Sequence, residues 1–587
     1  MKFITIFVIF FTIISINLAK LKVRISRDSD DISYIPTGNG KPVTANNGAK
    51  IANTFNILSA GKHGPVLLAD NIFLEKMSHF SRERTPERRN APIGNGAFGY
   101  FVCTNPDLPK LTSATIFSYV GKKTDLVVRF GVESGRIGGP EVGRGVNTMG
   151  IKFYSDHGNY DLLSLNVPVF SNRDPSRFLD FVHSRSPDPE TNAFNVDHAY
   201  DYPSLMPETM GILMNLYSDS SAIEGWRGMD FYPLNTFKFV NSQEKFVYVR
   251  FAIDALQKQK VLSEDERMWI AGIEPNSKSK DLREAIDSGN YPKWLLQAQV
   301  MSEKEFKQQT VNPLDPTRRW NVTRFPWFPM GKIVLNKNPT NWFSQVEQLA
   351  FNPGNIIPGI QLTLDKVLQG RIFAYRDTQN HRLGGNQFKL PINRPKVSLN
   401  QPYIRDGYCT DFDNGGSGPS FVPNSIDPVK EFEYHDFSDE TITNEDIKRF
   451  HTEYEDNYEE PRNLWNSFDS GHQRRIAKRF ASELVNVKTP IKNRFLDQIE
   501  RIDKGFRAKL EGEIRNLSND KSPKPPPVDS KPKISSRFES DISPRFESDI
   551  SPRYESDRSL PSPYSSLLTD FRSNVLKSFG RNGVIRG

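Results

Sequence analysis

Short apolar runs separated by polar turn residues dominate the chain between about residues 34 and 394. Several of these runs are rich in β-branched and aromatic residues, which is typical of strands. They are 125–130 (DLVVRF), 152–154 (KFY), 237–240 (FKFV) and 245–253 (KFVYVRFAI). The last two flank the turn-like Asn241-Ser242, so we expect a hairpin there. Helix-like stretches at 263–273 and 340–349 interrupt the strands.

The pattern changes after residue 395. Residues 396–442 begin with a Gly-, Pro- and Asn-rich stretch, which indicates an extended wrapping segment or linker. Residues 443–516 are charged and read as helical. Within them Ile476, Phe480, Leu484 and Val487 recur at helical spacing, so this face is expected to pack against a core.

Both ends of the chain differ from this globular part. Lys2 precedes an apolar run that extends to Leu18 and is followed by Ala19, which predicts a signal peptide over residues 1–19. The alternative is an uncleaved signal anchor. We expect a secreted protein, or one in the lumen of the secretory pathway, with no membrane association after cleavage. Export would permit glycosylation at Asn321 and Asn516, and Cys103 and Cys409 could pair, although the sequence does not show their proximity.

Residues 517–587 form a Pro- and Ser-rich tail. An eight-residue unit, RFESDISP, starts at Arg537 and again at Arg545, and a divergent copy follows from Arg553. Short charge-alternating repeats cannot bury a core, so we expect disorder. The tail is either an inert extension or a multivalent docking segment.

Composition narrows the functional classes. The 587 residues include 41 Phe, 19 Tyr and 7 Trp, which is ample material for a large core. The net charge of +7 is a mild excess without a nucleic-acid signature. Two cysteines exclude a disulfide-rich scaffold and a multi-thiolate metal site. The glycines at 94, 96 and 99 match a dinucleotide fingerprint, but the preceding residues are not strand-like.

The most informative segment is 371–379 (RIFAYRDTQ). In a helix, Arg371 and Tyr375 lie at i and i+4, so the guanidinium can sit beside the phenol oxygen. A neighbouring positive charge favours the phenolate, and a phenolate is a strong ligand for ferric haem iron. The pair alone is a weak signal, because such spacing is common in ordinary helices.

The whole segment resembles the proximal haem signature of the monofunctional catalases. Further collinear matches run from about residue 37 to 394, and a weaker match extends to about 515. They include 80–88, 94–101, 128–130, 152–154, 166–170, 181–183, 289–294, 345–354 and 381–384. The resemblance implies an α+β fold: an antiparallel eight-stranded β-barrel core over residues 34–395, a wrapping segment and a C-terminal helical region. It also implies haem b, hydrogen peroxide as substrate and a homotetramer.

The resemblance assigns roles to single residues. Tyr375 corresponds to the axial ligand of the haem iron, supported by Arg371. Arg88 and Arg129 correspond to the partners of the haem propionates, which suits the guanidinium fork. Phe178 corresponds to a residue near the distal haem face, and Asn166 to the amide that orients peroxide.

The distal side departs from the family pattern. The histidine that moves a proton between the peroxide oxygens is replaced by Ala91, and the serine that holds it by Gly131. Asn90 replaces a small apolar residue, but an amide is not an acid–base group near neutral pH. None of the nine histidines is expected in the distal pocket.

Three hypotheses follow from this mixture. The protein is a weakened peroxide-decomposing enzyme, a non-catalytic haem-binding pseudoenzyme, or an apo protein that retains only the fold. The retained haem-binding residues argue against the third. NADPH, which some catalases bind, is not expected, because Ser220 and Asp254 stand where basic residues would meet its phosphate.

Overall fold

A computed structural model describes residues 22–23, 36–37, 41–133, 135–410, 414–430, 449–450 and 456–519. The predicted signal peptide and the octapeptide-repeat segment lie outside the described residues, as does most of 431–455. The chain divides into two units, of which the first ends at Ser522. Everything below concerns that first unit.

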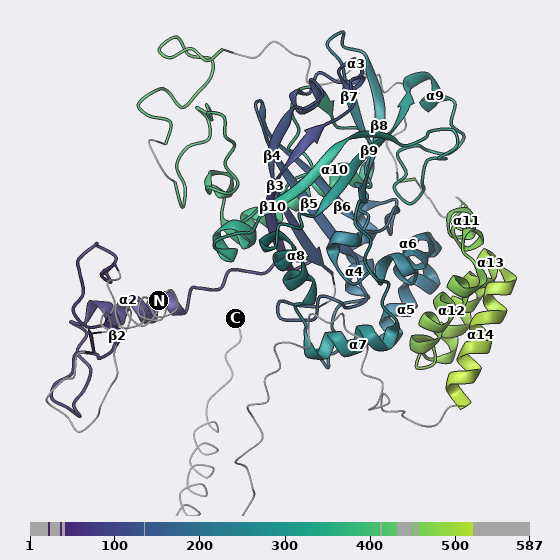
Figure 1. Cartoon of the computed structure of the whole chain (residues 1–587), viewed down its shortest axis with the longest axis horizontal. Coiled ribbons are helices and arrows are strands. Elements are labelled where there is room, and N and C mark those ends of the chain that lie inside the picture. Colours follow the sequence, from purple (N-terminus) through teal and green to yellow (C-terminus); the bar gives the residue numbers. More distant parts are fainter. Residues whose placement is uncertain are drawn as a thin grey trace, which may run out of the picture. The chain divides into compact units, whose positions relative to one another are not determined.

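One large antiparallel sheet forms the centre of the unit (Figure 1). Its strand order is β11-β7-β8-β9-β10-β3-β4-β5-β6. The strands are β3 (Ile93–Cys103), β4 (Lys123–Val132), β5 (Asn147–Ser155), β6 (Gly158–Leu165), β7 (Phe237–Val240), β8 (Phe246–Ala255), β9 (Lys293–Ser302), β10 (Phe328–Lys337) and the two-residue β11 (Ile360–Gln361). A separate two-stranded sheet pairs β1 (Lys22–Val23) with β2 (Pro36–Thr37). The predicted fold is confirmed, with eight longer strands and one short additional strand.

Isolated bridges bring the open edge of the sheet round toward the opposite half. Phe231 bridges Ile253 in β8, and the adjacent Tyr232 bridges Leu165 at the end of β6. The interior that results is filled by aromatic side chains such as Phe130, whose ring stacks on Trp226 at a centroid distance of 5.3 Å. A curled sheet therefore encloses a hydrophobic core rich in aromatic side chains.

Strand β4 separates that core from the candidate site. Its even-numbered residues from Leu126 to Val132 belong to the barrel core. Val127 instead joins a second cluster with Leu349 and Phe351, and Arg129 is a buried charge. Because side chains alternate along a strand, the odd-numbered positions of β4 face away from the barrel interior.

Three glycines of β3 mark close backbone approaches. A Cβ at Gly94, Gly96 or Gly99 would lie 1.9–2.5 Å from a carbonyl oxygen of a neighbouring strand. The three lie within one strand rather than at a strand–helix turn, so the dinucleotide fingerprint is coincidental.

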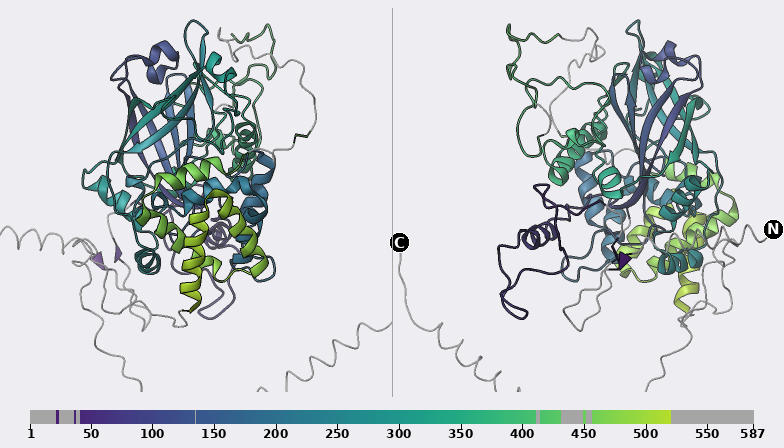
Figure 2. Two further views of the ribbon diagram at one scale, coloured as in Figure 1. Left: turned by 90° about the vertical axis from the view of Figure 1, so that its right-hand side faces the viewer. Right: turned by 60° about the vertical axis from the view of Figure 1, so that its left-hand side comes forward.

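Helices lie around the sheet, and a group of them forms a helical region at one end (Figures 1 and 2). Those before the linker are α2 (Asn71–Phe80), α3 (Leu108–Leu111), α4 (Pro175–His183), α5 (Val196–Leu205), α6 (Met210–Leu216), α7 (Glu264–Ile273), α8 (Ser277–Asp287), α9 (Glu303–Lys307) and α10 (Lys366–Leu383). Ser263 begins α7 with a capping box. The helix expected at 340–349 is a single π-helical turn over Phe343–Glu347.

Four helices follow the linker: α11 (Glu459–Ser467), α12 (Ser470–Leu484), α13 (Thr489–Ile502) and α14 (Lys504–Asn519). Ile476, Phe480, Leu484 and Val487 are all buried, in one hydrophobic cluster with residues of α5 and α6. The helical spacing predicted this packing, and Figure 2 shows the yellow-green helices gathered at one end of the barrel.

Cys103 is buried and Cys409 is exposed, and both are free thiols. Within the described ranges, no helix is long and apolar enough to span a membrane.

Candidate functional site

Helix α10 presents a tyrosine and an arginine to the outer side of the sheet. Arg371 Nη2 lies 3.3 Å from Tyr375 Oη, the contact expected from the i, i+4 spacing. A second nitrogen of Arg371 hydrogen-bonds Asn235, whose amide donates to Asp365 Oδ2 at 2.8 Å. Asp365 also caps the start of α10. Arg371 is thus held from two sides, and its charge is fixed next to the phenol oxygen.

Tyr375 packs against the same hydrophobic cluster that contains Val127 of β4. Val127 is two residues from Arg129, so both lie on the outer face of this strand. Arg382 is seven residues after Tyr375 and therefore lies on the same side of α10. Helix and strand together place the tyrosine near a group of arginines.

Three arginines in this group are buried around one carboxylate. Arg88 Nη1 lies 2.6 Å from Glu347 Oε2, and Arg382 Nη1 lies 3.2 Å from Oε1. Arg129 lies close enough for both arginines to act on it electrostatically. Desolvation, reinforced by these two cations, holds the pKa of Arg129 well below its ordinary value. Burial likewise lowers the pKa of Arg382 to about 10. One carboxylate cannot neutralise three cations, so the cluster favours an added anion.

Unused donors point to the same conclusion. Arg129 Nε and Arg382 Nε are buried and have no hydrogen-bond partner among the described residues. Arg88, in contrast, donates to Glu347 and to three backbone carbonyls. Buried donors are normally satisfied, which makes the two free ones a sign of a missing acceptor. The donor set fits the carboxylates of a haem.

Asn166 lies at the end of β6 with its amide oriented by the backbone. Its Oδ1 accepts from the Asn147 N–H at 2.8 Å, and its Nδ2 is buried without a described partner. Asn147 is itself fixed by buried Lys278, whose Nζ donates to Asn147 Oδ1 at 2.9 Å. Burial lowers the pKa of Lys278 to about 7. A positioned, unpaired amide donor suits the binding of a peroxide oxygen.

Neighbouring atoms lie close to the point where a side chain at position 131 would begin. A Cβ at Gly131 would lie 2.7 Å from Arg129 Nη1, 2.8 Å from Thr148 Oγ1 and 2.9 Å from Ala91 Cβ. Ala91 is buried and has a left-handed backbone with φ of 50°. Positions 91 and 131 are therefore in contact, and both lack a functional group.

Three further positions from the sequence analysis, Phe178, Ser220 and Asp254, have ordinary local surroundings. Phe178 stacks on Phe170 at a centroid distance of 5.2 Å, in a cluster with Val367 of α10. Ser220 Oγ lies 2.7 Å from Ser218 Oγ. Burial and the nearby Asp230 raise the pKa of Asp254 to about 6. Neither Ser220 nor Asp254 supplies positive charge for a nucleotide phosphate. That the protein binds no NADPH stays a prediction.

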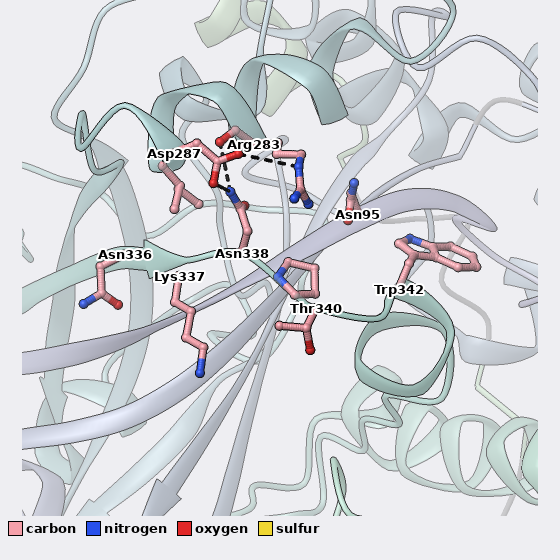
Figure 3. Close-up of a pocket in the computed structure, with 10 residues that line it drawn as sticks. Asn95, Arg283, Asp287, Asn336, Lys337, Asn338, Thr340 and Trp342 are labelled. Carbon is pink, nitrogen blue, oxygen red and sulfur yellow. Dashed lines mark hydrogen bonds and ion pairs between the residues drawn. The ribbon is translucent and has the colours of Figure 1, made fainter. Parts of the chain in front are cut away.

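A pocket of about 710 Å³ lies elsewhere on the sheet (Figure 3). Asn95, Trp342 and the polar ends of α8 and β10 line it, and Asn338 bonds Asp287 across it at 2.8 Å. Its lining includes none of the predicted site residues.

Comparisons with known proteins agree with this architecture. The catalase family model matches residues 44–428, and a model described as catalase-related immune-responsive matches residues 451–513. The chain belongs to the catalase family. Catalase of Ascaris suum is 39% identical over 478 residues, covering 81% of this chain and 88% of that catalase. Catalase of Rattus norvegicus is 36% identical over 484 residues, covering 82% and 91%.

Solved catalase structures share the fold. A fungal catalase superposes with a TM-score of 0.79 at 32% identity and covers 86% of this chain and 99% of its own. Catalase A from Saccharomyces cerevisiae gives a TM-score of 0.78, also at 32% identity, covering 81% and 99%. The family reaction is the decomposition of hydrogen peroxide, and the family cofactor is haem.

Sequence reasoning missed two residues of this site. Arg382 lies inside the family-like segment 381–384, and its spacing from Tyr375 could have placed it on the same helix face. Glu133 follows β4 and was not distinguishable from a surface acid, because its contact with Asn90 joins two segments that are distant in the sequence.

The arginine cluster gives a prediction that separates charge from packing. In haem-free protein, Arg129→Met should raise the free energy of unfolding by up to about 4 kcal/mol, because it removes an uncompensated buried cation. Arg88→Met should lower it by about 3–5 kcal/mol, because it breaks a buried ion pair. Urea denaturation measures both. Equal destabilisation by the two variants would contradict an excess of positive charge.

Proposed function

We propose that the protein is a secreted, haem-binding member of the catalase family that decomposes hydrogen peroxide at a reduced rate. The observation that carries the proposal is the buried arginine cluster with unused donors beside Tyr375. A protein that kept only the fold would gain nothing from burying three cations around one acid.

The chain's residues then have distinct tasks. Tyr375 would ligate the haem iron through its phenol oxygen, and Arg371 lies beside that oxygen. Arg129 and Arg382 donate their free nitrogens to the haem carboxylates, while Arg88 anchors the cluster through Glu347. Bound haem would supply a redox-active iron for the two-electron chemistry of peroxide. Asn166 Nδ2 orients the peroxide.

The reduced rate follows from positions 91 and 131. An alanine and a glycine cannot accept or donate a proton, and loss of a positioned acid–base group typically costs ~10²–10⁴-fold. The alternative function is a non-catalytic haem-binding pseudoenzyme. The contact between Ala91 and the Cβ position of Gly131 favours it, because neither of these adjoining residues carries a group that exchanges protons.

Spectroscopy of purified protein tests the proposal. A Soret band with one haem per chain and slow oxygen evolution from peroxide are the expected results. Absence of a Soret band after reconstitution would overturn both haem-based functions, whereas haem without oxygen evolution would favour the pseudoenzyme. Secretion and a homotetramer, which rest on the apolar N-terminus and on the family resemblance, are checked by N-terminal sequencing of exported protein and by light scattering.

A further inference from the structure

We propose that Glu133 is a catalytic residue that accepts and returns the proton during peroxide cleavage, in place of the missing distal histidine. This inference rests on the proposed function, since it needs peroxide to be cleaved at this site. It identifies a carboxyl group that the family resemblance did not assign.

The register of β4 directs Glu133 toward the site. Arg129, Gly131 and Glu133 are alternate residues, and alternate side chains of a strand share a face. The Glu133 N–H donates to the Val146 carbonyl at 2.8 Å, which continues the ladder with β5 beyond the end of β4. The Cβ position of Gly131 lies 2.9 Å from Ala91 Cβ. Glu133 therefore extends along the face on which the distal pair is missing.

Asn90 connects Glu133 to the distal segment from the other side. With its amide nitrogen turned toward the carboxylate, Asn90 donates to Glu133 Oε1 and to the Arg89 carbonyl, each at 3.2 Å. In the opposite orientation the amide oxygen would accept from a protonated carboxyl. Asn90 can thus serve both protonation states of Glu133, although it cannot titrate itself. It is a positioning residue.

The surroundings of Glu133 suit a group that exchanges protons near neutral pH. Burial raises its pKa from the ordinary value to about 7, against the opposing charge of Arg89. Arg89 comes from the segment before β3, and on the β5 side the partner is the apolar Val146. An acid–base catalyst works best when its pKa lies near the working pH. Glu133 meets this condition without any histidine.

One carboxylate is enough for the proton transfers, because the proton that it accepts is the proton that it returns. Glu133 would take the proton from one peroxide oxygen and give it to the other oxygen, which leaves as water with both electrons of the O–O bond. The bound haem would supply the two electrons that the remaining oxygen then lacks, and the second peroxide would restore them as it is oxidised to O2. The overall reaction, two H2O2 giving two H2O and O2, consumes no protons. The carboxylate is thus regenerated, and no other co-reactant is needed beyond the second peroxide of the family reaction.

Glu133→Gln tests the assignment in reconstituted, full-length protein. It keeps the size and the Asn90 contact but removes the titration, so kcat/KM for peroxide should fall ~10²-fold or more with an unchanged Soret band. Glu133→Asp should retain part of the activity. The matched control is Glu224→Gln, which replaces another acid whose pKa is raised by desolvation; Glu224 lies outside the site, so this variant should leave kcat/KM unchanged. Equal kcat/KM for Glu133→Gln and wild type would overturn the assignment while leaving the proposed function intact.

A titration readout is independent of turnover. Infrared difference spectra of the wild type should show a protonated carboxyl stretch that disappears with a midpoint near pH 7, and Glu133→Gln should lack it. In the wild type kcat/KM should rise with pH through the same midpoint, because the carboxylate is the proton acceptor. A band with its midpoint near pH 4.5, or a pH profile that Glu133→Gln leaves unchanged, would contradict the proposal. A wild type that binds haem but evolves no oxygen at any pH would overturn it together with the proposed function.

Folding of the variant is not at risk from the lost charge. A carboxyl whose folded pKa lies above its unfolded value binds more protons in the folded state, so its contribution to stability falls as pH rises from about 4.5 to 7. Above that window Glu133→Gln should be at least as stable as wild type, which urea denaturation verifies.

Discussion

Tyr375→Phe should abolish stable haem incorporation. Phenylalanine preserves the packing of the ring against the outer face of β4 but removes the phenol oxygen, which contacts Arg371 and is the proposed iron ligand. Losing a partner of a metal ligand typically costs ~10–100-fold in affinity, and losing the ligand itself should cost more. The haem-to-protein ratio after gel filtration, read from the Soret and protein absorbances, measures the effect.

Two variants make that result specific. Tyr154→Phe removes a hydroxyl from the same hydrophobic cluster, where it donates to the Ile392 carbonyl at 2.6 Å, and should leave the haem content unchanged. Arg371→Met keeps the ligand and removes its charged neighbour, so haem should be retained ~10–100-fold more weakly. Full haem occupancy in Tyr375→Phe would exclude Tyr375 as the axial ligand.

Local pattern was sufficient for the parts of this protein that depend on regular spacing. Two β-branched and aromatic runs flanking a turn predicted the β7–β8 hairpin, and the i, i+4 relation predicted the contact of Arg371 with Tyr375. The buried face of α12 was likewise readable, because Ile476 and Phe480 repeat with the period of a helix. In each case the information is carried by residues within one or two turns of each other.

The rest depends on contacts between distant segments. The sequence cannot show that Arg88 and Arg382 share Glu347, since the three residues come from separate parts of the chain. Nor can it show that Asn90 lies beside Glu133, or that desolvation in the fold raises the pKa of this otherwise ordinary acid. Chemistry in this site arises from burial, and burial is a property of the assembled fold.

Ala91→His should restore fast peroxide decomposition. Histidine tolerates the left-handed backbone of position 91 better than bulky residues do, and its imidazole would stand beside the Thr148 hydroxyl that borders Gly131. In the Glu133→Gln background the expected gain in kcat/KM is ~10²–10⁴-fold. In the wild type the gain should be smaller, because Glu133 already moves the proton. The difference between the two gains, measured by oxygen evolution, is the coupling of the two sites.

Adding the serine as well should not help. A Cβ at position 131 would meet Arg129, Thr148 and residue 91 within 2.9 Å, so Gly131→Ser should lower the free energy of unfolding by about 1–3 kcal/mol. It should also disturb Arg129, whose Nη1 is the nearest of these atoms, and thereby weaken haem retention. Ala91→His/Gly131→Ser is therefore expected to turn over more slowly than Ala91→His alone. A double variant that is both more stable and faster than Ala91→His would contradict this expectation. It would mean that position 131 has room for a serine side chain.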